Sequence, residues 1–491
     1  MFSRFRFLRR LITRKPGTET SALVVGSTGS GKSEGELVDL VRLADRRDCA
    51  VVLLDGHGPL AFAAASHWAA RGHEPRIVYE PLDATDRVLG WGVLPRGSFA
   101  DPARQRLEDA EAREGLSQCF MSQRNLTTLN DRGYTKEWLD AALSLCLSQP
   151  EPVPLPSLLA AFRVGTPEYE RLLRSCGDPR TVAKFRDVEH VKRRNPVQYE
   201  LFTSPARRLL ELTCGSEVVR LRSRPGPFRW PEALRDRCLV AFDGGGIRSR
   251  ELKRTVFLLV ALAVIHAVRR HFAEARTPLP VVLVLEEAGA LGLATPFVQL
   301  ALQELRKAGV AIHLISQSSL DFGDPAFFQS LLGNAPRQIW YQCLSPADQE
   351  LGAKALTNAT FDPDAVHFTR VRSVPEGKSL ASPWRARMRR VIDRYFKSPS
   401  LQEQEYRTRL ATLRVGERLV RDRTGVRRER VRPLRPPRVP GGFETFTRAV
   451  IGRVRERPLY LPPLPPETSW HPEPLPDAAE RLRVEAAEAG E

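Results

Sequence analysis

The residues most suited to chemistry lie in one glycine-rich stretch near the start of the chain. Residues 26–33 fit the pattern G-x-x-x-x-G-K-[ST], in which glycines let the backbone turn tightly and aim its amide groups at phosphate oxygens. The predicted phosphate-binding residues are Gly26, Ser27, Thr28, Gly29, Ser30, Gly31, Lys32 and Ser33. We expect Lys32 to reach the β- and γ-phosphates of ATP or GTP, and Ser33 to hold Mg²⁺.

Such a loop needs a strand before it and a helix after it. Residues 22–25 are apolar and predict a buried strand, and apolar residues recur at helical spacing from Leu37 to Val41. Residues 49–55, CAVVLLD, predict the next central strand, so the stretch forms a βαβ unit with the nucleotide at the carboxyl ends of its strands. Asp55 and His57 fall at that edge. They are either close to the phosphates or ordinary turn residues.

Two further strands end in residues that suit phosphate chemistry. Residues 280–285 predict a strand that ends in Glu286 and Glu287. One carboxylate can orient the Mg²⁺ shell and the other can polarise the attacking water, and we assign Glu286 and Glu287 to these roles in that order. The alternative is a pair of exposed acids closing a strand. Residues 310–315 predict a strand that ends at Gln317, a candidate sensor of the γ-phosphate, and His313 within it is expected to be a core histidine.

The amino-acid composition indicates which kind of binding partner and which cellular compartment suit the protein. The 491 residues carry a net charge of +17, which favours a polyanionic partner, nucleic acid before membrane, or else reflects a solvated arginine-rich surface. The seven cysteines form no C-x-x-C pair, which predicts a reducing cytoplasm and no zinc site. The longest apolar run, residues 255–268, is shorter than the roughly 20 residues of a membrane span and is expected to be a core helix. With no transmembrane segment expected, any membrane association would depend on partners.

The chain divides into five parts that differ in composition and predicted secondary structure. The fold class we expect is α/β, a P-loop ATPase core with a mostly parallel sheet, interrupted by an all-helical insertion domain and followed by a proline-rich tail. A hairpin is predicted from residues 413–420 and 429–434; before it, the chain beyond Phe368 is expected to be basic and irregular and then helical over residues 401–410. The expected parts are a basic N-terminal arm (1–20), the first part of the core (21–95), the helical insertion (96–230), the second part of the core (231–435) and an extended, acidic-ended tail (436–491).

The motifs, taken in order, resemble those of the HerA/FtsK superfamily of ring-forming ATPases. Within it, the likeness is to the cytosolic part of conjugative type IV coupling proteins, and it covers roughly residues 21–95 and 237–434. The helical block also matches the all-helical domain of coupling proteins in position. The stretches that carry the resemblance are LVVGSTGSGKS, VVLLDGHGPLA, VVLVLEEAGAL, ELRKAGVAIHLISQSSLDF and LLGNAPRQIWYQCLSPADQE.

The resemblance implies a RecA-like core, a hexameric ring, ATP bound between subunits and DNA moved through a basic channel. Arg337, or else Arg306, would supply an arginine across the subunit interface, with Arg337 preferred. The chain departs from the family in having Glu286 where an aspartate is usual, and in lacking the membrane-spanning anchor of many coupling proteins.

The expected function is an ATP-driven DNA translocase, with a relaxase, a secretion channel or a nuclease as possible protein partner. The alternatives left open are a DNA-end-processing or genome-packaging motor, a non-hydrolysing nucleotide-dependent scaffold, and a motor for protein secretion.

Overall fold

The computed structural model describes residues 20–92, 102–121, 129–149, 153–293, 302, 305–323, 325–360, 362–379, 382–439 and 441–463. The predicted N-terminal arm up to residue 19 and the acidic chain end lie outside these residues. The centre of the fold is a nine-stranded sheet. Its strands, in spatial order, are β11 (Gly425–Arg430), β10 (Glu417–Asp422), β7 (Arg337–Trp340), β1 (Ala22–Val25), β6 (Val310–Ser316), β5 (Val281–Leu285), β2 (Ala50–Asp55), β4 (Leu239–Asp243) and β3 (Ile77–Pro81).

The strands from β7 to β3 are all parallel, and only the pairings of β10 with β7 and with β11, at one edge, are antiparallel. Every residue of β1, β2, β5 and β6 is buried, as expected for strands covered on both faces and composed of nearly continuous apolar runs. The prediction of an α/β fold with a mostly parallel sheet is therefore confirmed.

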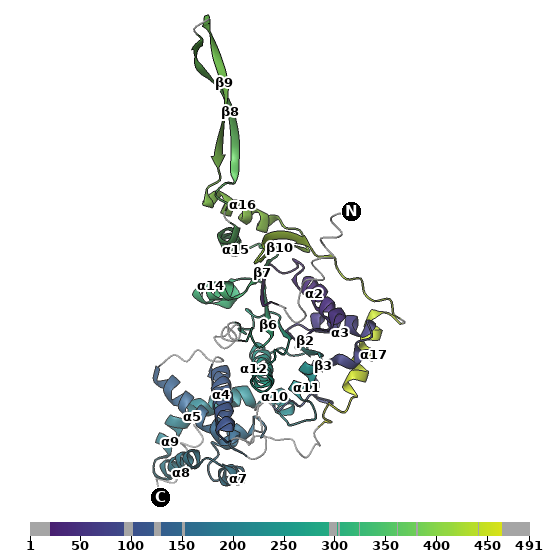
Figure 1. The fold of residues 1–491 in the computed structure, drawn as a ribbon. Helices are drawn as coiled ribbons and strands as arrows, with labels where there is room; N and C mark the ends of the chain where they lie inside the picture. Colours follow the sequence, from purple (N-terminus) through teal and green to yellow (C-terminus); the bar gives the residue numbers. More distant parts are fainter. Residues whose placement is uncertain are drawn as a thin grey trace.

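Helices cover both faces of the sheet (Figure 1). Helices α2 (Lys32–Arg46) and α3 (Pro59–Ala70) lie on one side, and α12 (Arg250–Ala275) and α14 (Pro325–Asn334) on the other. Helix α12 is long and apolar enough to cross a membrane by length and composition alone, but 72% of its apolar window is buried inside the protein. Thr255 to Val268 are all buried, so this stretch is the core helix that its sequence predicts.

Between β3 and β4, the described part of the chain contains helices and no strand. The group lies at one end of the molecule, against α12, in the position expected for the insertion (Figure 1). Its members are α4 (Pro102–Met121), α5 (Leu129–Leu147), α6 (Ser157–Ala160), α7 (Pro167–Ser175), α8 (Pro179–Arg194), α9 (Pro196–Cys214), α10 (Glu217–Arg222) and α11 (Trp230–Arg235).

A buried ion pair fastens the end of this helical group to the sheet. The Arg222 Nε lies 2.7 Å from Glu80 Oε1 on β3, and the Arg222 Nη2 donates to the carbonyl oxygens of Pro81 and Ala84. Both charged side chains are almost fully buried. Removing one member of such a pair leaves an uncompensated buried charge.

Replacing Arg222 by leucine is therefore expected to lower the free energy of unfolding by about 3–5 kcal/mol, because Glu80 loses its counter-charge. Urea denaturation followed by circular dichroism measures this change. The double variant Arg222→Leu/Glu80→Leu should recover part of the loss, and an unchanged denaturation midpoint in the single variant would contradict the importance of the pair.

In the last third of the chain, the prediction of an irregular stretch is wrong, and the bounds of the predicted hairpin are shifted. The stretch expected to be irregular beyond Phe368 forms a two-stranded antiparallel ribbon of β8 (Val366–Ser379) and β9 (Ser382–Phe396) between helices α15 (Pro346–Thr360) and α16 (Pro399–Thr412). Frequent arginines, together with Pro375, hide the alternating pattern of these strands. The predicted hairpin exists, but its strands are β10 and β11. The turn at Asp422–Gly425 sets the pairing of these two strands, and Gly425 adopts a φ of 115° there.

The tail predicted to be extended contains helix α17 (Phe443–Arg455), which packs against α3. The Thr447 hydroxyl donates to the Ser66 Oγ at 2.7 Å, and the Tyr460 hydroxyl bonds to both the backbone N–H and the carbonyl of Tyr79 on the edge strand β3. Prolines on both sides of this segment made the whole tail look extended, although Thr447, Val450 and Val454 recur at helical spacing on its buried face.

Candidate nucleotide-binding site

The phosphate loop follows β1 and leads directly into α2. Gly29 and Gly31 adopt positive φ angles of 76° and 95°, and a Cβ on Gly26 would lie 2.5 Å from the Cβ of Tyr341. The Lys32 ammonium donates to the carbonyl oxygens of Gly26 at 2.5 Å and Ser27 at 2.9 Å. The lysine thus lies over its own loop, with burial lowering its pKa and the nearby Glu287 and Glu286 carboxylates opposing that shift. This is the geometry of a phosphate cradle.

The two predicted carboxylates stand at the end of β5, two strands away from β1 in the sheet. The Ser33 hydroxyl donates to Glu286 Oε1 at 2.6 Å, so the glutamate, longer than the usual aspartate, reaches the hydroxyl predicted to hold the metal. Glu287 has a positive φ of 57°. Among the described non-glycine residues with a positive φ, it is the one that belongs to this site. Such strain of about 1–3 kcal/mol is typical of functional positions.

Gln317 follows β6, the strand between β1 and β5, and it connects the loop to the second carboxylate. Its Oε1 accepts a hydrogen bond from the Thr28 hydroxyl at 2.5 Å, and its Nε2 donates to Glu287 Oε1 at 2.7 Å. His57, which is largely exposed, places its Nε2 3.8 Å from the same carboxylate oxygen. Thr28, Gln317 and Glu287 therefore form a continuous chain of side chains across three neighbouring strand ends.

Replacing Thr28 by valine removes the hydroxyl that holds Gln317 to the loop while keeping the shape of the side chain. A neutral hydrogen bond contributes about 1 kcal/mol, so we expect kcat for ATP hydrolysis to fall about fivefold, with KM for ATP changed less than about twofold. Steady-state kinetics measure both constants. Thr28→Ser should retain the wild-type kcat, whereas equal losses in the two variants would mean that the hydroxyl has no such role.

Two aspartates that sequence reasoning missed hold the Gln317 loop in place. Asp321 Oδ2 accepts hydrogen bonds from the Ser316 hydroxyl at 2.9 Å and the Ser318 N–H at 3.0 Å. Asp348, at the start of α15, accepts from the Ser318 hydroxyl and from the Ser319 N–H. The run Ser-Gln-Ser-Ser before Asp321 could have signalled the first contact, but Asp348 comes from a distant stretch that carries no such signal.

Asp55 is the last residue of β2, the strand next to β5 in the sheet. Its contacts agree in part with both interpretations, that of a turn residue and that of a residue at the nucleotide site. Its carboxylate accepts from the backbone N–H groups of His57 and Ala61 at 2.9 Å each, which is turn and helix-start chemistry. It also lies next to Glu286: burial first, and then the Asp55 carboxyl, raise the pKa of Glu286 to about 9. The carboxyl ends of four adjacent strands thus contribute to one site.

The side chains present fit a divalent cation. Within the part of the chain that the structure describes, Glu286 Oε2 is buried and accepts no hydrogen bond, while its partner oxygen bonds to Ser33. A second carboxylate, Asp55, stands beside it. Hydroxyl and carboxylate oxygens form the donor set that Mg²⁺ prefers, so Ser33 and Glu286 remain the residues suited to hold it.

No family model and no curated protein sequence matches the chain. Among solved structures, it is similar to the plasmid coupling protein TrwB in complex with ADP and Mg²⁺ and to the same protein with a non-hydrolysable ATP analogue. In both comparisons identity is 15%, the match covers 88% of this chain and 94% of that chain, and the TM-score is 0.50. VirB4 of Thermoanaerobacter pseudethanolicus matches at 15% identity over 86% of this chain and 91% of that chain, with a TM-score of 0.49.

The chain has a RecA-like P-loop ATPase fold. At this identity the likeness concerns the fold.

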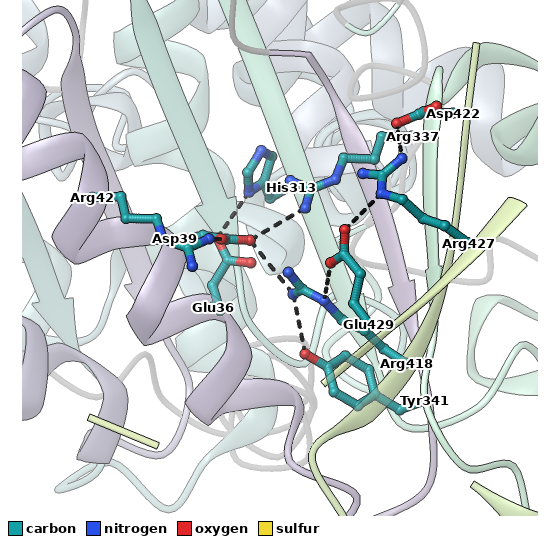
Figure 2. Close-up of polar contacts among 10 residues, drawn as sticks. All are labelled: Glu36, Asp39, Arg42, His313, Arg337, Tyr341, Arg418, Asp422, Arg427 and Glu429. Atoms are coloured by element: carbon teal, nitrogen blue, oxygen red, sulfur yellow. Dashed lines mark hydrogen bonds and ion pairs between the residues drawn. The ribbon is translucent and has the colours of Figure 1, made fainter. Parts of the chain in front are cut away.

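Within this P-loop ATPase fold, Arg337 does not lie with the other predicted site residues. It begins β7 and pairs with Ala22, so it stands at the amino-terminal edge of the sheet, opposite the phosphate loop. Figure 2 shows Arg337 and Arg418 pointing toward the Asp39 carboxylate, each at 3.5 Å. Burial opposes ionisation of Asp39, but these two guanidinium groups lower its pKa.

The Arg337 side chain is 15% exposed, and its guanidinium group contacts the Asp39 carboxylate of its own subunit. Arg306, the other arginine considered, is exposed in the turn before β6. His313 belongs to the same buried region, where its Nδ1 lies 2.8 Å from Glu36 Oε1, and it is the core histidine that its apolar strand predicts.

Proposed function

We propose that this protein is a P-loop ATPase that binds and hydrolyses ATP with Mg²⁺ and uses the energy to move DNA. One observation carries the ATPase assignment: Lys32, Ser33, Glu286, Glu287 and Gln317 come together at the carboxyl ends of three neighbouring parallel strands. Phosphoryl transfer to water requires a cradle of backbone amides, a lysine, a hydroxyl and a carboxylate that can bind a metal ion, and a second carboxylate that can activate water.

Each residue has a distinct role in this proposal. The loop amides and Lys32 bind the phosphates, and Ser33 with Glu286 would hold Mg²⁺, which when bound offsets the negative charge of the phosphate oxygens. Glu287 orients the attacking water and accepts its proton. Gln317 holds Glu287 in position and, through Thr28, couples its placement to the state of the loop.

The assignment of DNA as the cargo rests on charge and on likeness of fold. The net charge of +17 suits a polyanion, and the solved structures with a TM-score of 0.50 are of a plasmid coupling protein. We propose a hexameric ring with ATP at the subunit interfaces, acting in the cytoplasm with a relaxase or secretion channel. A DNA-end-processing or packaging motor would use the same site and differ in its protein partner.

The test is ATP hydrolysis by the purified full chain, with and without single- and double-stranded DNA. We expect measurable turnover that rises on addition of DNA and is abolished in Glu287→Gln. Turnover unaffected by DNA, together with no DNA binding at low salt, would overturn the translocase proposal. Equal, negligible turnover in the wild type and in Glu287→Gln would instead favour the nucleotide-dependent scaffold.

A further inference from the structure

The β8–β9 ribbon, Val366–Ser379 paired with Ser382–Phe396, is the most prominent feature that the ATPase site does not use. It projects away from the body at the β10 side of the molecule, at the end opposite the helical group (Figure 1). A strand of 14 residues spans about 45 Å, which exceeds one turn of B-DNA. A two-stranded ribbon alone is at best marginally stable in water, so a partner along its length is expected.

The ribbon is strongly basic. Between residues 366 and 396, lysine and arginine outnumber aspartate and glutamate by eight to two. At its base the Arg372 Nε pairs with Asp393 Oδ2 at 2.7 Å, which neutralises one of these charges, while Arg370 is exposed. The sequence toward the tip, Arg-Ala-Arg-Met-Arg-Arg at 385–390, contains no acidic residue. The charge therefore calls for an anionic partner.

The base of the ribbon also exposes large apolar side chains on both faces. Phe368 and Tyr395 stack with ring centroids 4.3 Å apart and are 49% and 42% exposed. Val371 and Ile392, paired on the other face, are each 60% exposed. These side chains offer contact area beside the charges, as aromatic and apolar residues do next to bases and sugars.

We propose that the β8–β9 ribbon binds duplex DNA by lying in the major groove. The groove is about 12 Å wide and admits a two-stranded β-ribbon, and the arginines would contact the phosphates that line it. The excess of positive charge on the ribbon favours a polyanion as occupant over a second copy of this chain, which is itself basic overall. The inference rests on the proposed function in taking DNA as the partner, and it adds a contact outside the ATP site.

The body can keep its structure when the ribbon is changed, because the root of the ribbon is closed and anchored without it. The Lys397 N–H donates to the Ala365 carbonyl at 2.7 Å, which joins the two chain ends at the root. Helices α15 and α16 are held together by the Thr360 and Tyr406 hydroxyls at 2.9 Å, and the Gln402 Nε2 donates to the Asp362 carbonyl at 2.8 Å. Substitutions toward the tip therefore leave these contacts intact.

The experiment compares the wild type with a ribbon variant and a charge-matched control. The ribbon variant carries Arg385→Gln, Arg387→Gln, Arg389→Gln and Arg390→Gln. The control removes the same charge from exposed helix positions on the body through Arg42→Gln, Arg174→Gln, Arg193→Gln and Arg448→Gln. Binding to a fluorescein-labelled 30-base-pair duplex is followed by anisotropy at several KCl concentrations, with native mass and DNA-free ATP turnover measured in parallel.

We expect the ribbon variant to bind the duplex at least about tenfold more weakly than the control. Its slope of log affinity against log salt should be shallower by about 3.6 if all four arginines contact phosphates, since each lost phosphate contact removes about 0.9. Native mass and DNA-free ATP turnover should match the wild type.

Equal affinity and slope in the two variants would overturn the ribbon assignment while leaving the DNA motor intact. Loss of assembly in the ribbon variant, with DNA affinity per subunit retained, would overturn it in favour of a second copy of the chain as the occupant. A wild type that binds no duplex would overturn the ribbon assignment together with the proposed DNA cargo.

Discussion

Replacing Glu287 by glutamine is expected to lower kcat for ATP hydrolysis by at least about 100-fold, because glutamine cannot accept the proton of the attacking water. ATP affinity should stay within about threefold of the wild type, since glutamine keeps the size of the side chain and its ability to bond to the Gln317 amide. Phosphate release in steady state measures kcat, and a fluorescent ATP analogue measures binding.

A glutamate outside the site provides the control. Glu274, on α12, is 44% exposed and pairs with Arg270, so Glu274→Gln should leave both kcat and ATP affinity unchanged. Retention of more than about a tenth of wild-type turnover in Glu287→Gln would show that another group activates the water. The Glu286 carboxylate would then be the next candidate, because it lies at the same strand end.

Replacing Lys32 by alanine is expected to weaken ATP binding by about 10- to 100-fold, which corresponds to the loss of a charge-assisted hydrogen bond to a phosphate oxygen. Lys32 is buried, donates to the loop carbonyls of Gly26 and Ser27 and interacts electrostatically with Glu286 and Glu287, so its removal also takes a positive charge away from these two carboxylates. Isothermal titration calorimetry with ATP and Mg²⁺ measures the loss.

The matched control for this lysine is Lys307→Ala, at an exposed position in the turn before β6. It should bind ATP as the wild type does. Thermal melting of both variants separates loss of binding from loss of folding. An unchanged ATP affinity in a folded Lys32→Ala variant would contradict the assignment of the loop as the phosphate cradle.

The core of this fold is readable from the sequence because its parallel strands are buried on both faces. Runs such as those of β2 and β5 are then apolar throughout, and each ends in a polar residue at the same edge of the sheet. That arrangement is why Gln317, Glu286 and the phosphate loop could be predicted as strand-end residues before their distances were known.

The contacts between these residues could not be predicted, because they depend on which strands are neighbours. The chain of hydrogen bonds from Thr28 through Gln317 to Glu287 exists only because β6 lies between β1 and β5. Asp348 reaches the Gln317 loop from a helix some thirty residues further along, with no local signal. Arg337 shows the same limit: the sequence does not reveal that the parallel register places it at the amino-terminal edge of the sheet.

The β8–β9 ribbon and α17 escaped prediction for a different physical reason. In both, the local composition does not display the structure that the segment adopts. In the ribbon, arginines stand where apolar residues would mark a buried face, since neither face is covered by the body. In α17, a short amphipathic pattern lies between proline-rich segments, and packing against α3 decides its structure.

The most direct test of the account is ATP-driven movement on DNA. Streptavidin bound to one biotinylated end of single- or double-stranded DNA is displaced by a motor that moves along the strand, and free biotin traps the released streptavidin. We predict displacement by the wild type with ATP and Mg²⁺, at least about 100-fold slower displacement by Glu287→Gln, and none with a non-hydrolysable analogue. Stable DNA binding and active ATP turnover without displacement from any DNA end would contradict the proposal that this protein is a DNA translocase.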